Sequence, residues 1–545
     1  MKGIFWGFFL IFINFYVTIN GHTLNLLPTF AGYILLYRAA GELLGESGRF
    51  GNLRPFAVAV AIYTGILWVG DLLGVTGANW LSTLLELAAL AVALYISWSV
   101  IQAILEMETH YGTDLNGTSA RTAWFVLLAA QIAGTLGGLL LEKLPRKKPL
   151  LILLIAAHLA VLAAFKYAGF AARSINALVP DLLPVFAPAL PLGISFYVFT
   201  AIGYLADVSC GKVAAARSPF RFFVFLAFFG HGPSGPIVRY DQQLPCLDAK
   251  AAERQVSLDR FCYGIKRFVL GLAKKAIIAD QLALIYSRVT SVPAATVPAP
   301  ALVLGYLAYM MQLYFDFSGY SDMAIGIGSF FGLELPENFN YPYLSCSVGE
   351  YWRRWHMSLS GWFRDYVYIP LGGSRCSLAK NCRNLLIVFL LTGLWHGAAW
   401  QYVAFGLLHG VLLCLERLGL RKFLQRIPPF FAHAYTLVVL WFTLIIFGAH
   451  GLAEGLAAWK GILSWQSGAQ GYTAAAFADT KLMVLLAASL LLCGPLQACF
   501  PRLKKALYAK EAPGLPGMVG LLVLLFLSLM RVTAGTYSAF IYFQF

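Results

Sequence analysis

The sequence predicts an all-α, polytopic membrane protein. Of its 545 residues, 59% are apolar and 12% are charged, whereas about a quarter of the residues in a typical soluble domain are charged. The mean hydropathy is +0.72. At about 20 apolar residues per span, the apolar runs suffice for roughly 10–13 membrane elements. This composition excludes a soluble enzyme.

The positive charge of the chain does not indicate a nucleic-acid partner. Lys and Arg exceed Asp and Glu by 40 − 25 = 15, but the basic residues form short clusters between apolar runs, as cytoplasmic membrane loops do. One such cluster, residues 143–148, is expected to face the cytoplasm. The nine cysteines contain no C-x-x-C pair, which argues against a disulfide framework or a metal site.

The first apolar runs, at 3–17, 24–37, 56–70 and 87–105, contain no group of reactive side chains. A polar stretch at 107–121 follows them and is the best candidate for a boundary. We therefore expect an N-terminal transmembrane segment of unknown role at 1–118 and a catalytic core at 119–545.

The core begins with apolar runs at 123–141 and 149–165 and then becomes irregular. A short apolar run ends in the sequence Gly-His-Gly-Pro-Ser-Gly-Pro at 230–236. It is too short to cross a bilayer, and non-helical backbone at membrane depth must be buried in protein or line an aqueous cavity. This segment is either a re-entrant element or an interfacial loop.

A basic amphipathic helix is expected at 349–366. Its apolar residues recur at steps of three and four and so share one helical face: Trp352, Trp355, Leu359, Trp362 and Tyr366. Arg353, Arg354 and Arg364 point elsewhere, which is typical of a helix that lies in the membrane plane. Further apolar runs follow at 384–394, 398–413, 434–448, 482–499 and 517–530.

Polar residues are concentrated in the segment 314–322, between two apolar runs. The segment includes Asp316, Ser318, Tyr320 and Asp322. Polar side chains inside a membrane are costly and usually functional, so these residues predict the wall of a polar cavity that binds substrate. The alternative is a helix cap at the membrane surface.

A histidine also lies between apolar runs, at position 396. A buried histidine is more often structural than catalytic, but Trp395 and Gly397 flank this one, and glycine leaves room for backbone or substrate to approach. Histidine can take up and return a proton near neutral pH. His396 is therefore a candidate general base, and His356 is a second candidate. No G-x-S-x-G, H-E-x-x-H or P-loop motif is present.

From about residue 143 onward, the sequence resembles the membrane-bound O-acyltransferase family, in particular its bacterial alginate and peptidoglycan O-acetylation branch. The resemblance rests on the segments 191–197, 235–240, 271–280, 314–322, 336–343, 351–356, 364–366 and 394–397. Within them, His396 matches the family's catalytic histidine and His356 its second characteristic histidine.

The resemblance implies an acetyltransferase with a central funnel or tunnel. A cytoplasmic thioester would donate the acyl group, either an acyl-CoA such as acetyl-CoA or another thioester such as that of a carrier protein. No tightly bound cofactor is expected. Trp352, Trp395, Arg353, Arg354 and Asn340 would bind substrate. The two arginines would hold phosphates of the donor; contact with anionic membrane lipid is the alternative.

The predicted function is transfer of an acyl group across a bacterial inner membrane to a polysaccharide hydroxyl. The chain has no large hydrophilic domain, so we also expect an extracytoplasmic partner protein that accepts the group or presents the glycan. Two alternatives are D-alanyl transfer to teichoic acid and, in a different class, a secondary transporter or lipid flippase.

Overall fold

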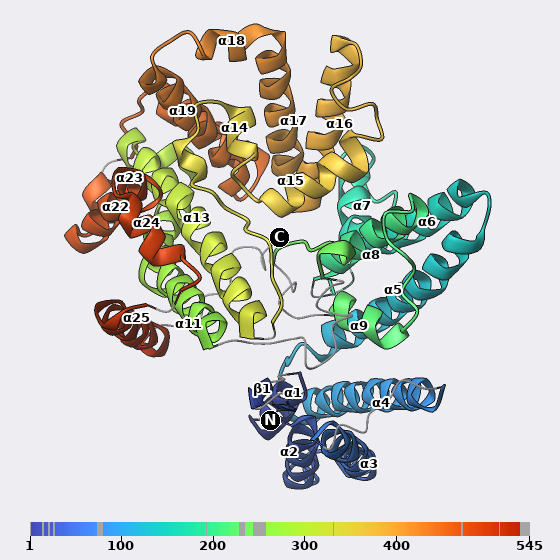
Figure 1. The fold of residues 1–545 in the computed structure, drawn as a ribbon. Helices are drawn as coiled ribbons and strands as arrows, with labels where there is room; N and C mark the ends of the chain where they lie inside the picture. Colours follow the sequence, from blue (N-terminus) through green and yellow to red (C-terminus); the bar gives the residue numbers. More distant parts are fainter. Residues whose placement is uncertain are drawn as a thin grey trace. The chain divides into compact units, whose positions relative to one another are not determined.

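A computed structural model describes residues 2–12, 16–19, 22–25, 28–72, 80–186, 188, 190–191, 193–227, 235–243, 258–330, 332–469, 472–511 and 513–534. These residues are almost entirely helical (Figure 1), apart from one antiparallel hairpin of β1 (Tyr16–Ile19) and β2 (His22–Asn25). The predicted all-helical architecture is confirmed.

The chain divides into two compact units, of which the first comprises Met1–Pro233, Val238–Gly264 and Ile327–Glu334. After the hairpin and the preceding α1 (Lys2–Phe12), its helices are α2 (Thr29–Glu42), α3 (Arg49–Leu72), α4 (Trp80–Tyr111), α5 (Gly117–Lys143), α6 (Lys147–Lys166), α7 (Ala168–Asn176), α8 (Ile194–Ser209) and α9 (Pro219–Ala227). Helix α8 packs on both α5 and α6.

The second unit comprises Ser234–Ile237, Ile265–Gly326 and Leu335–Phe545. Its elements up to residue 396 are most of α11 (Leu258–Ala273), η2 (Lys274–Ala279), α12 (Asp280–Thr290), η3 (Ala294–Thr296), most of α13 (Ala299–Phe330), η4 (Pro342–Leu344), α14 (Val348–Trp352), α15 (Met357–Phe363), η5 (Arg364–Tyr368) and α16 (Leu378–His396). The remaining elements are α17 (Trp400–Leu415), η6 (Glu416–Leu420), α18 (Arg421–Leu424), α19 (Pro429–Gly448), α20 (Leu452–Leu463), α21 (Ala474–Phe477), α22 (Thr480–Leu492), α23 (Pro495–Cys499), α24 (Pro501–Tyr508) and α25 (Leu515–Ala534).

Six helical segments of the described chain are long and apolar enough to cross a membrane. They are Ala91–Tyr111, Gly117–Lys143, Lys147–Lys166, Trp400–Leu424, Pro429–Gly448 and Leu515–Ala534. The shorter helices α8 and α22 are also apolar. The chain is therefore a multi-pass membrane protein, as its composition predicts.

Helices α16 and α17 form a tight antiparallel hairpin (Figure 1) because glycines lie where they cross. A Cβ atom at Gly393 would lie 2.3 Å from the carbonyl oxygen of Tyr402, and one at Gly406 would lie 2.3 Å from that of Phe389. Small residues let helix backbones approach closely in membrane proteins. This hairpin holds His396 at its turn.

The prediction of one continuous helix at 349–366 is wrong. The segment forms α14 and α15, and the chain breaks between them at residues 353–356. The predicted apolar residues Trp352, Trp355, Leu359 and Trp362 are nevertheless buried. The break has a non-local cause, since the backbone N–H of Asn340 donates to Arg354 O at 2.9 Å and that of Met357 donates to Asn338 O at 3.0 Å. The predicted re-entrant element at 230–236 lies largely outside the described residues.

Candidate active site

His396 is the last residue of α16, and it is 4% exposed. The next residue, Gly397, has an extended backbone, and a Cβ atom there would lie 2.2 Å from the ring of Tyr402. Only glycine lets the chain leave α16 so close to this ring. The end of the helix, and with it the position of the imidazole, is thus fixed by packing.

Aromatic rings surround the His396 imidazole. Its centroid lies 5.0 Å from the Trp395 ring, 5.1 Å from Phe447 and 6.0 Å from Phe405. The rings of Phe447 and Phe405 meet the imidazole nearly at right angles. This shell limits the access of water, which strengthens electrostatic interactions inside the site.

His356 is fully buried and has a left-handed backbone, with φ 42° and ψ 55°. For a residue with a side chain this conformation costs about 1–2 kcal/mol. Asn338 supports it, because Asn338 Oδ1 accepts hydrogen bonds from Ser358 Oγ at 2.6 Å and Ser358 N at 3.3 Å. Strained residues held in this way are concentrated at functional sites.

Trp395 brings the two histidines into one site. Its ring lies 5.0 Å from the His396 ring and 5.5 Å from the His356 ring, measured between centroids. Burial lowers the pKa of His356 to about 3, so this imidazole is neutral at physiological pH. His356, Trp395 and His396, which the sequence singled out for catalysis and binding, therefore lie together.

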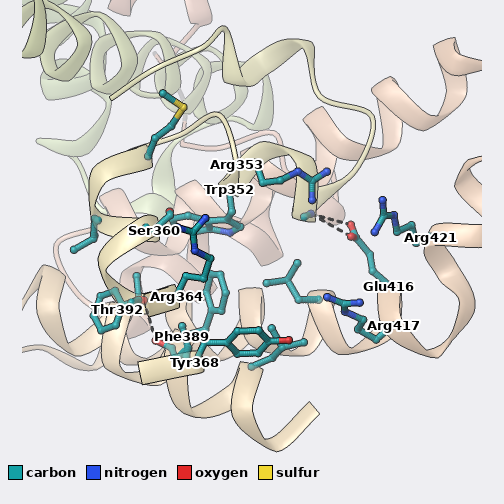
Figure 2. A pocket seen from close by; sticks show the side chains of 18 residues that line it. Trp352, Arg353, Ser360, Arg364, Tyr368, Phe389, Thr392, Glu416, Arg417 and Arg421 are labelled. Carbon is teal, nitrogen blue, oxygen red and sulfur yellow. Dashed lines mark hydrogen bonds between the residues drawn. The ribbon is translucent and has the colours of Figure 1, made fainter. Parts of the chain in front are cut away.

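A cavity of about 480 Å³ opens beside α14 and α15, and Figure 2 shows it; we call it the arginine cavity. Its lining residues are Gly349, Trp352, Arg353, Met357, Leu359, Ser360, Gly361, Phe363, Arg364, Tyr368, Leu385, Val388, Phe389, Thr392, Leu413, Glu416, Arg417 and Arg421. Four arginines and one carboxylate give the lining an excess of positive charge.

Glu416 is held in place by the first turn of α14. Its carboxylate accepts hydrogen bonds from Val348 N at 2.6 Å and from Gly349 N at 3.1 and 3.2 Å. Free amides at a helix N-terminus favour a carboxylate partner. Arg353 follows α14 and extends toward Glu416, as Figure 2 shows. Because four arginines and only one carboxylate line the arginine cavity, it is best suited to bind an anion.

The two neighbouring arginines have different surroundings. Arg353 lines the arginine cavity, together with Trp352. Arg354 instead forms an ion pair with Glu350 at 2.8 Å and donates to the backbone oxygen of Asn340 at 3.2 Å. Arg354 therefore holds the chain at the break between α14 and α15, and it does not line this cavity.

A second cavity, of about 280 Å³, lies between α13, α24 and the segment after α13; we call it the tyrosine cavity. Its lining residues are Lys274, Tyr314, Ser318, Ser321, Asp322, Glu337, Asn338, Phe339, Asn340, Tyr341, Met357, Lys504 and Tyr508. Met357 lines both cavities, directly after His356. Both cavities thus include the residue that follows His356, although His356 itself lines neither of them.

The carboxylates of 314–322 lie in the interior of α13 and not at a helix cap. Lys275 Nζ donates to Asp316 Oδ1 at 2.6 Å, and Lys274 Nζ donates to Asp322 Oδ2 at the same distance. Arg267 pairs with Asp322 as well. A buried carboxylate needs such a cation to offset its lost hydration.

The polar residues of this segment do not all reach the tyrosine cavity. Ser318, Asp322 and Asn340 line it, whereas Asp316 and Tyr320 are not among its lining residues. Asp316 is buried against Lys275, and Tyr320 is half-buried. Among the residues that the structure describes, no group of three or more His, Cys, Asp or Glu side chains is placed to hold a metal ion.

Sequence reasoning missed His409, which is 1% exposed and positions Trp352. Trp352 Nε1 donates to His409 Nδ1 at 3.0 Å, and His409 Nε2 lies 3.1 Å from Thr443 Oγ1. Since an indole N–H can only donate, His409 accepts at Nδ1 and donates from Nε2. It lies in an apolar run of α17, where a lone histidine gives no distinguishing signal. Asn338 was also not predicted as a site residue, although it lies in the motif 336–343, because its bonds to Ser358 join segments that are distant in the sequence.

The chain belongs to the membrane-bound O-acyltransferase family, whose model matches residues 78–458. It is 44% identical to a probable alginate O-acetylase AlgI of Pseudomonas putida over 308 residues, which are 55% of this chain and 62% of that protein. It is 35% identical to a peptidoglycan O-acetyltransferase of Helicobacter pylori over 344 residues, covering 58% of this chain and 65% of the relative.

A teichoic acid D-alanyltransferase of Bacillus subtilis is 34% identical over 233 residues, which are 41% of this chain and 58% of that protein. The chain thus matches less than two thirds of the length of each of these relatives. The family resemblance that the sequence motifs predict is confirmed.

Proposed function

We propose that this protein is an O-acyltransferase that moves an acetyl group from a thioester donor to a hydroxyl of a cell-envelope polysaccharide. The observation that supports this most is the pair of buried histidines on either side of Trp395, beside a cavity lined by four arginines. The names of the alginate, peptidoglycan and teichoic acid relatives favour an envelope polymer as the acceptor.

In the proposed reaction, His396 acts as a general base. Its imidazole takes the proton of the acceptor hydroxyl while that oxygen attacks the thioester carbonyl carbon. The carbon–sulfur bond then breaks, and the departing thiolate receives the proton from the imidazolium. Acetyl passes to the acceptor, and the donor leaves as a free thiol. His356, neutral and rigidly held, and Trp395 orient the reacting groups.

The arginine cavity binds the phosphates of the donor. Arg353, Arg364, Arg417 and Arg421 line it, and guanidinium groups match phosphate geometry with paired hydrogen bonds. Acetyl-CoA is the donor that this charge favours. Arg354 contributes to folding of the site, as its pair with Glu350 suggests.

The polymer is modified outside the cytoplasmic membrane of a bacterium. An extracytoplasmic partner protein accepts the acyl group or presents the glycan over the site, because the apolar chain leaves little hydrophilic surface to hold a polymer. Anionic lipid around the basic helix ends would be the remaining partner. We assign acyl transfer to residues 119–545.

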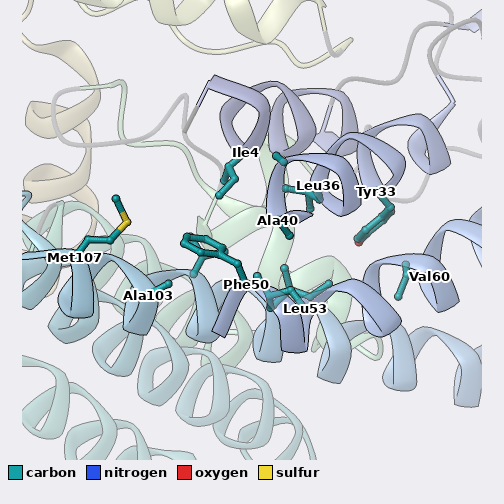
Figure 3. Packing of buried hydrophobic residues seen from close by; sticks show 12 residues of the cluster. Ile4, Tyr33, Leu36, Ala40, Phe50, Leu53, Val60, Ala103 and Met107 are labelled. Carbon is teal, nitrogen blue, oxygen red and sulfur yellow. The ribbon is translucent and has the colours of Figure 1, made fainter. Parts of the chain in front are cut away.

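The role of residues 1–118 is structural in this proposal. Helices α1 to α4 share a core of their own, shown in Figure 3, and its buried members are Ile4, Tyr33, Leu36, Ala39, Ala40, Phe50, Leu53, Val60, Ile96, Val100, Ala103 and Met107. This core contains none of the proposed catalytic residues, although α4 also packs on α5 and α9. Removal of the segment would therefore leave the chemistry intact in a chain that still inserts.

The test is incubation of the purified protein in lipid nanodiscs with acetyl-CoA that is radiolabelled in the acetyl group. We expect label to reach an acetylatable polysaccharide or its partner protein, and free CoA to appear in equal amount. A secondary transporter or flippase would consume no acetyl-CoA. If the protein does not use acetyl-CoA but transfers D-alanine from a carrier protein, it is a D-alanyltransferase and not an acetyltransferase.

A further inference from the structure

We propose that Tyr368 binds the acyl donor, by donating a hydrogen bond from its phenol group to a phosphate oxygen, and that Asn381 orients Tyr368 for this contact. This inference rests on the proposed acyl transfer and adds a neutral group to the arginines that bind the phosphates. Tyr368 is half-buried and lines the arginine cavity, where Figure 2 shows its ring. Asn381 is 4% exposed and lies in the first turn of α16.

The amide group of Asn381 can face its two partners in only one way. Its Nδ2 atom lies 2.7 Å from the hydroxyl oxygen of Tyr368 and 3.0 Å from the backbone oxygen of Gly373. A backbone oxygen only accepts hydrogen bonds, so the nitrogen of the amide must face Gly373. The same nitrogen then donates its second proton to the Tyr368 hydroxyl. The phenol keeps its own proton, for which no acceptor is found among the described residues.

The turn after Tyr368 holds the backbone of this residue. Gly373 N donates to Tyr368 O at 2.9 Å. Gly372 and Gly373 have positive φ angles of 109° and 56°, which glycine adopts at little cost. Asn384 is fully buried, and its Nδ2 atom donates to Leu371 O at 2.9 Å. The backbone and the hydroxyl group of Tyr368 are thus both held by α16, and a group that is oriented before binding loses less entropy when the ligand binds.

The Tyr368 hydroxyl lies far from the reacting thioester of the proposed reaction. Its partner Asn381 precedes His396 in α16 by 396 − 381 = 15 residues, which is about 22 Å along the helix axis. In an acyl-CoA, a long flexible arm separates the thioester from the phosphates. With the thioester at His396, the part of the acyl donor that reaches Tyr368 is the phosphate end.

An arginine borders the same end of the hairpin of α16 and α17. Cys414 Sγ donates to the backbone oxygen of Cys382 at 3.5 Å, so the end of α17 lies beside the start of α16. The next element, η6, also contacts α16 and carries Arg417. Arg417 and Tyr368 both line the arginine cavity. A phosphate there would accept hydrogen bonds from a guanidinium and from the phenol, and bonds to a charged oxygen are stronger than neutral ones.

The experiment measures binding of CoA to the full-length protein in nanodiscs by calorimetry, with no acetyl group and no acceptor present. Tyr368→Phe removes only the hydroxyl group. It should raise the Kd of CoA about 10- to 100-fold, as expected for the loss of a hydrogen bond to a charged group. ADP, which has two phosphates but no flexible arm, is the second probe, in competition with CoA. Its Kd should rise by the same factor.

Tyr366→Phe is the matched control, since Tyr366 is the other tyrosine of η5, is also half-buried and does not line the cavity. This variant should leave both Kd values unchanged. Equal Kd values of CoA for the wild type and Tyr368→Phe, or equal losses in the two variants, would overturn the assignment. The phosphate contact would be wrong if ADP does not compete with CoA, or if Tyr368→Phe weakens CoA and not ADP.

Asn381→Leu tests the orienting role of the amide. We expect it to weaken CoA binding in the wild type but not in Tyr368→Phe, because no phenol proton then remains to be directed. An equal loss of CoA affinity in both backgrounds would show that Asn381 only supports the fold.

The binding measurement contains no thioester, so it is independent of the proposed activity. A protein whose CoA affinity depends on Tyr368 but which transfers no acetyl group would refute only the activity. Acetyl transfer by a protein whose CoA affinity does not depend on Tyr368 would refute only this inference.

Discussion

Replacing His409 by leucine should disturb the arginine cavity from a position outside its lining. Leucine fills the space but cannot accept the hydrogen bond that Trp352 Nε1 donates at 3.0 Å. The indole N–H, on a residue that is 7% exposed, would then be buried without a partner. Leaving such a group unsatisfied costs about 1–3 kcal/mol.

The conservative variant His409→Gln separates the hydrogen bonds from mere volume. Its Oε1 can accept from Trp352 and its Nε2 can donate to Thr443, as the histidine does. We expect His409→Gln to lose less than about 1 kcal/mol and His409→Leu the full 1–3 kcal/mol. Thermal unfolding of the purified protein in nanodiscs measures both, with the exposed His110→Gln as control.

Kinetics and a double-mutant cycle complete this test. Trp352 lines the arginine cavity, which we propose binds the donor. His409→Leu should therefore raise KM for the donor more than it lowers kcat. In a protein that already contains Trp352→Phe, the leucine should cost much less, since no indole N–H remains to be satisfied. Equal stability of the leucine and glutamine variants, or additive effects in the cycle, would refute the reasoning.

Three further predictions concern the support of the site. Gly397→Ala should destabilise the protein by about 1–3 kcal/mol in thermal unfolding, because the added Cβ atom would lie 2.2 Å from the Tyr402 ring; unchanged stability would contradict the packing described. Lys275→Met should lower the free energy of unfolding by about 3–5 kcal/mol, because Asp316 loses the amine that pairs with it. Adding Asp316→Leu should recover most of this loss. A double variant that is no more stable than Lys275→Met would contradict the pairing. Burial lowers the pKa of His356 to about 3. Between about pH 6.5 and pH 3, His356 therefore binds a proton only in the unfolded chain. Protonation of the unfolded chain lowers the stability of the folded protein as the pH falls through that window. In His356→Gln, the stability should depend less steeply on pH in this window. A dependence as steep as that of the wild type would contradict the assignment of this effect to His356.

Local sequence was sufficient to find the residues around His396. The motif 394–397 places a tryptophan, a histidine and a glycine in succession between apolar runs, and the helix end that the glycine allows depends on its own neighbours. Apolar composition likewise predicted a helical multi-pass protein. These features follow from residues that are close together in the chain.

The break between α14 and α15 could not be predicted from the local sequence. The apolar spacing of 349–366 favours one helix, and the hydrogen bonds that interrupt it come from the segment around Asn338. Arg353 lines the arginine cavity together with Glu416, whereas Arg354 pairs with Glu350. No pattern at two adjacent arginines can show which of them reaches a cavity.

The carboxylates of α13 show the same limit. Their density predicted a polar wall or a helix cap, but their partners Lys274 and Lys275 lie 48 and 41 residues earlier in the chain. Such long-range ion pairs are set by how helices pack. Sequence reasoning could therefore identify Asp316 and Asp322 as costly residues without saying what balances them.

The most direct test of the account is the rate of acetyl transfer by His396→Ala, measured with radiolabelled acetyl-CoA and acceptor under conditions where the wild type is active. His110→Ala, at an exposed position, is the control. We predict a loss of about 100-fold or more, with the variant inserted and thermally almost as stable as the wild type. A stable variant that retains more than about a tenth of the wild-type rate would contradict the role of His396 as general base.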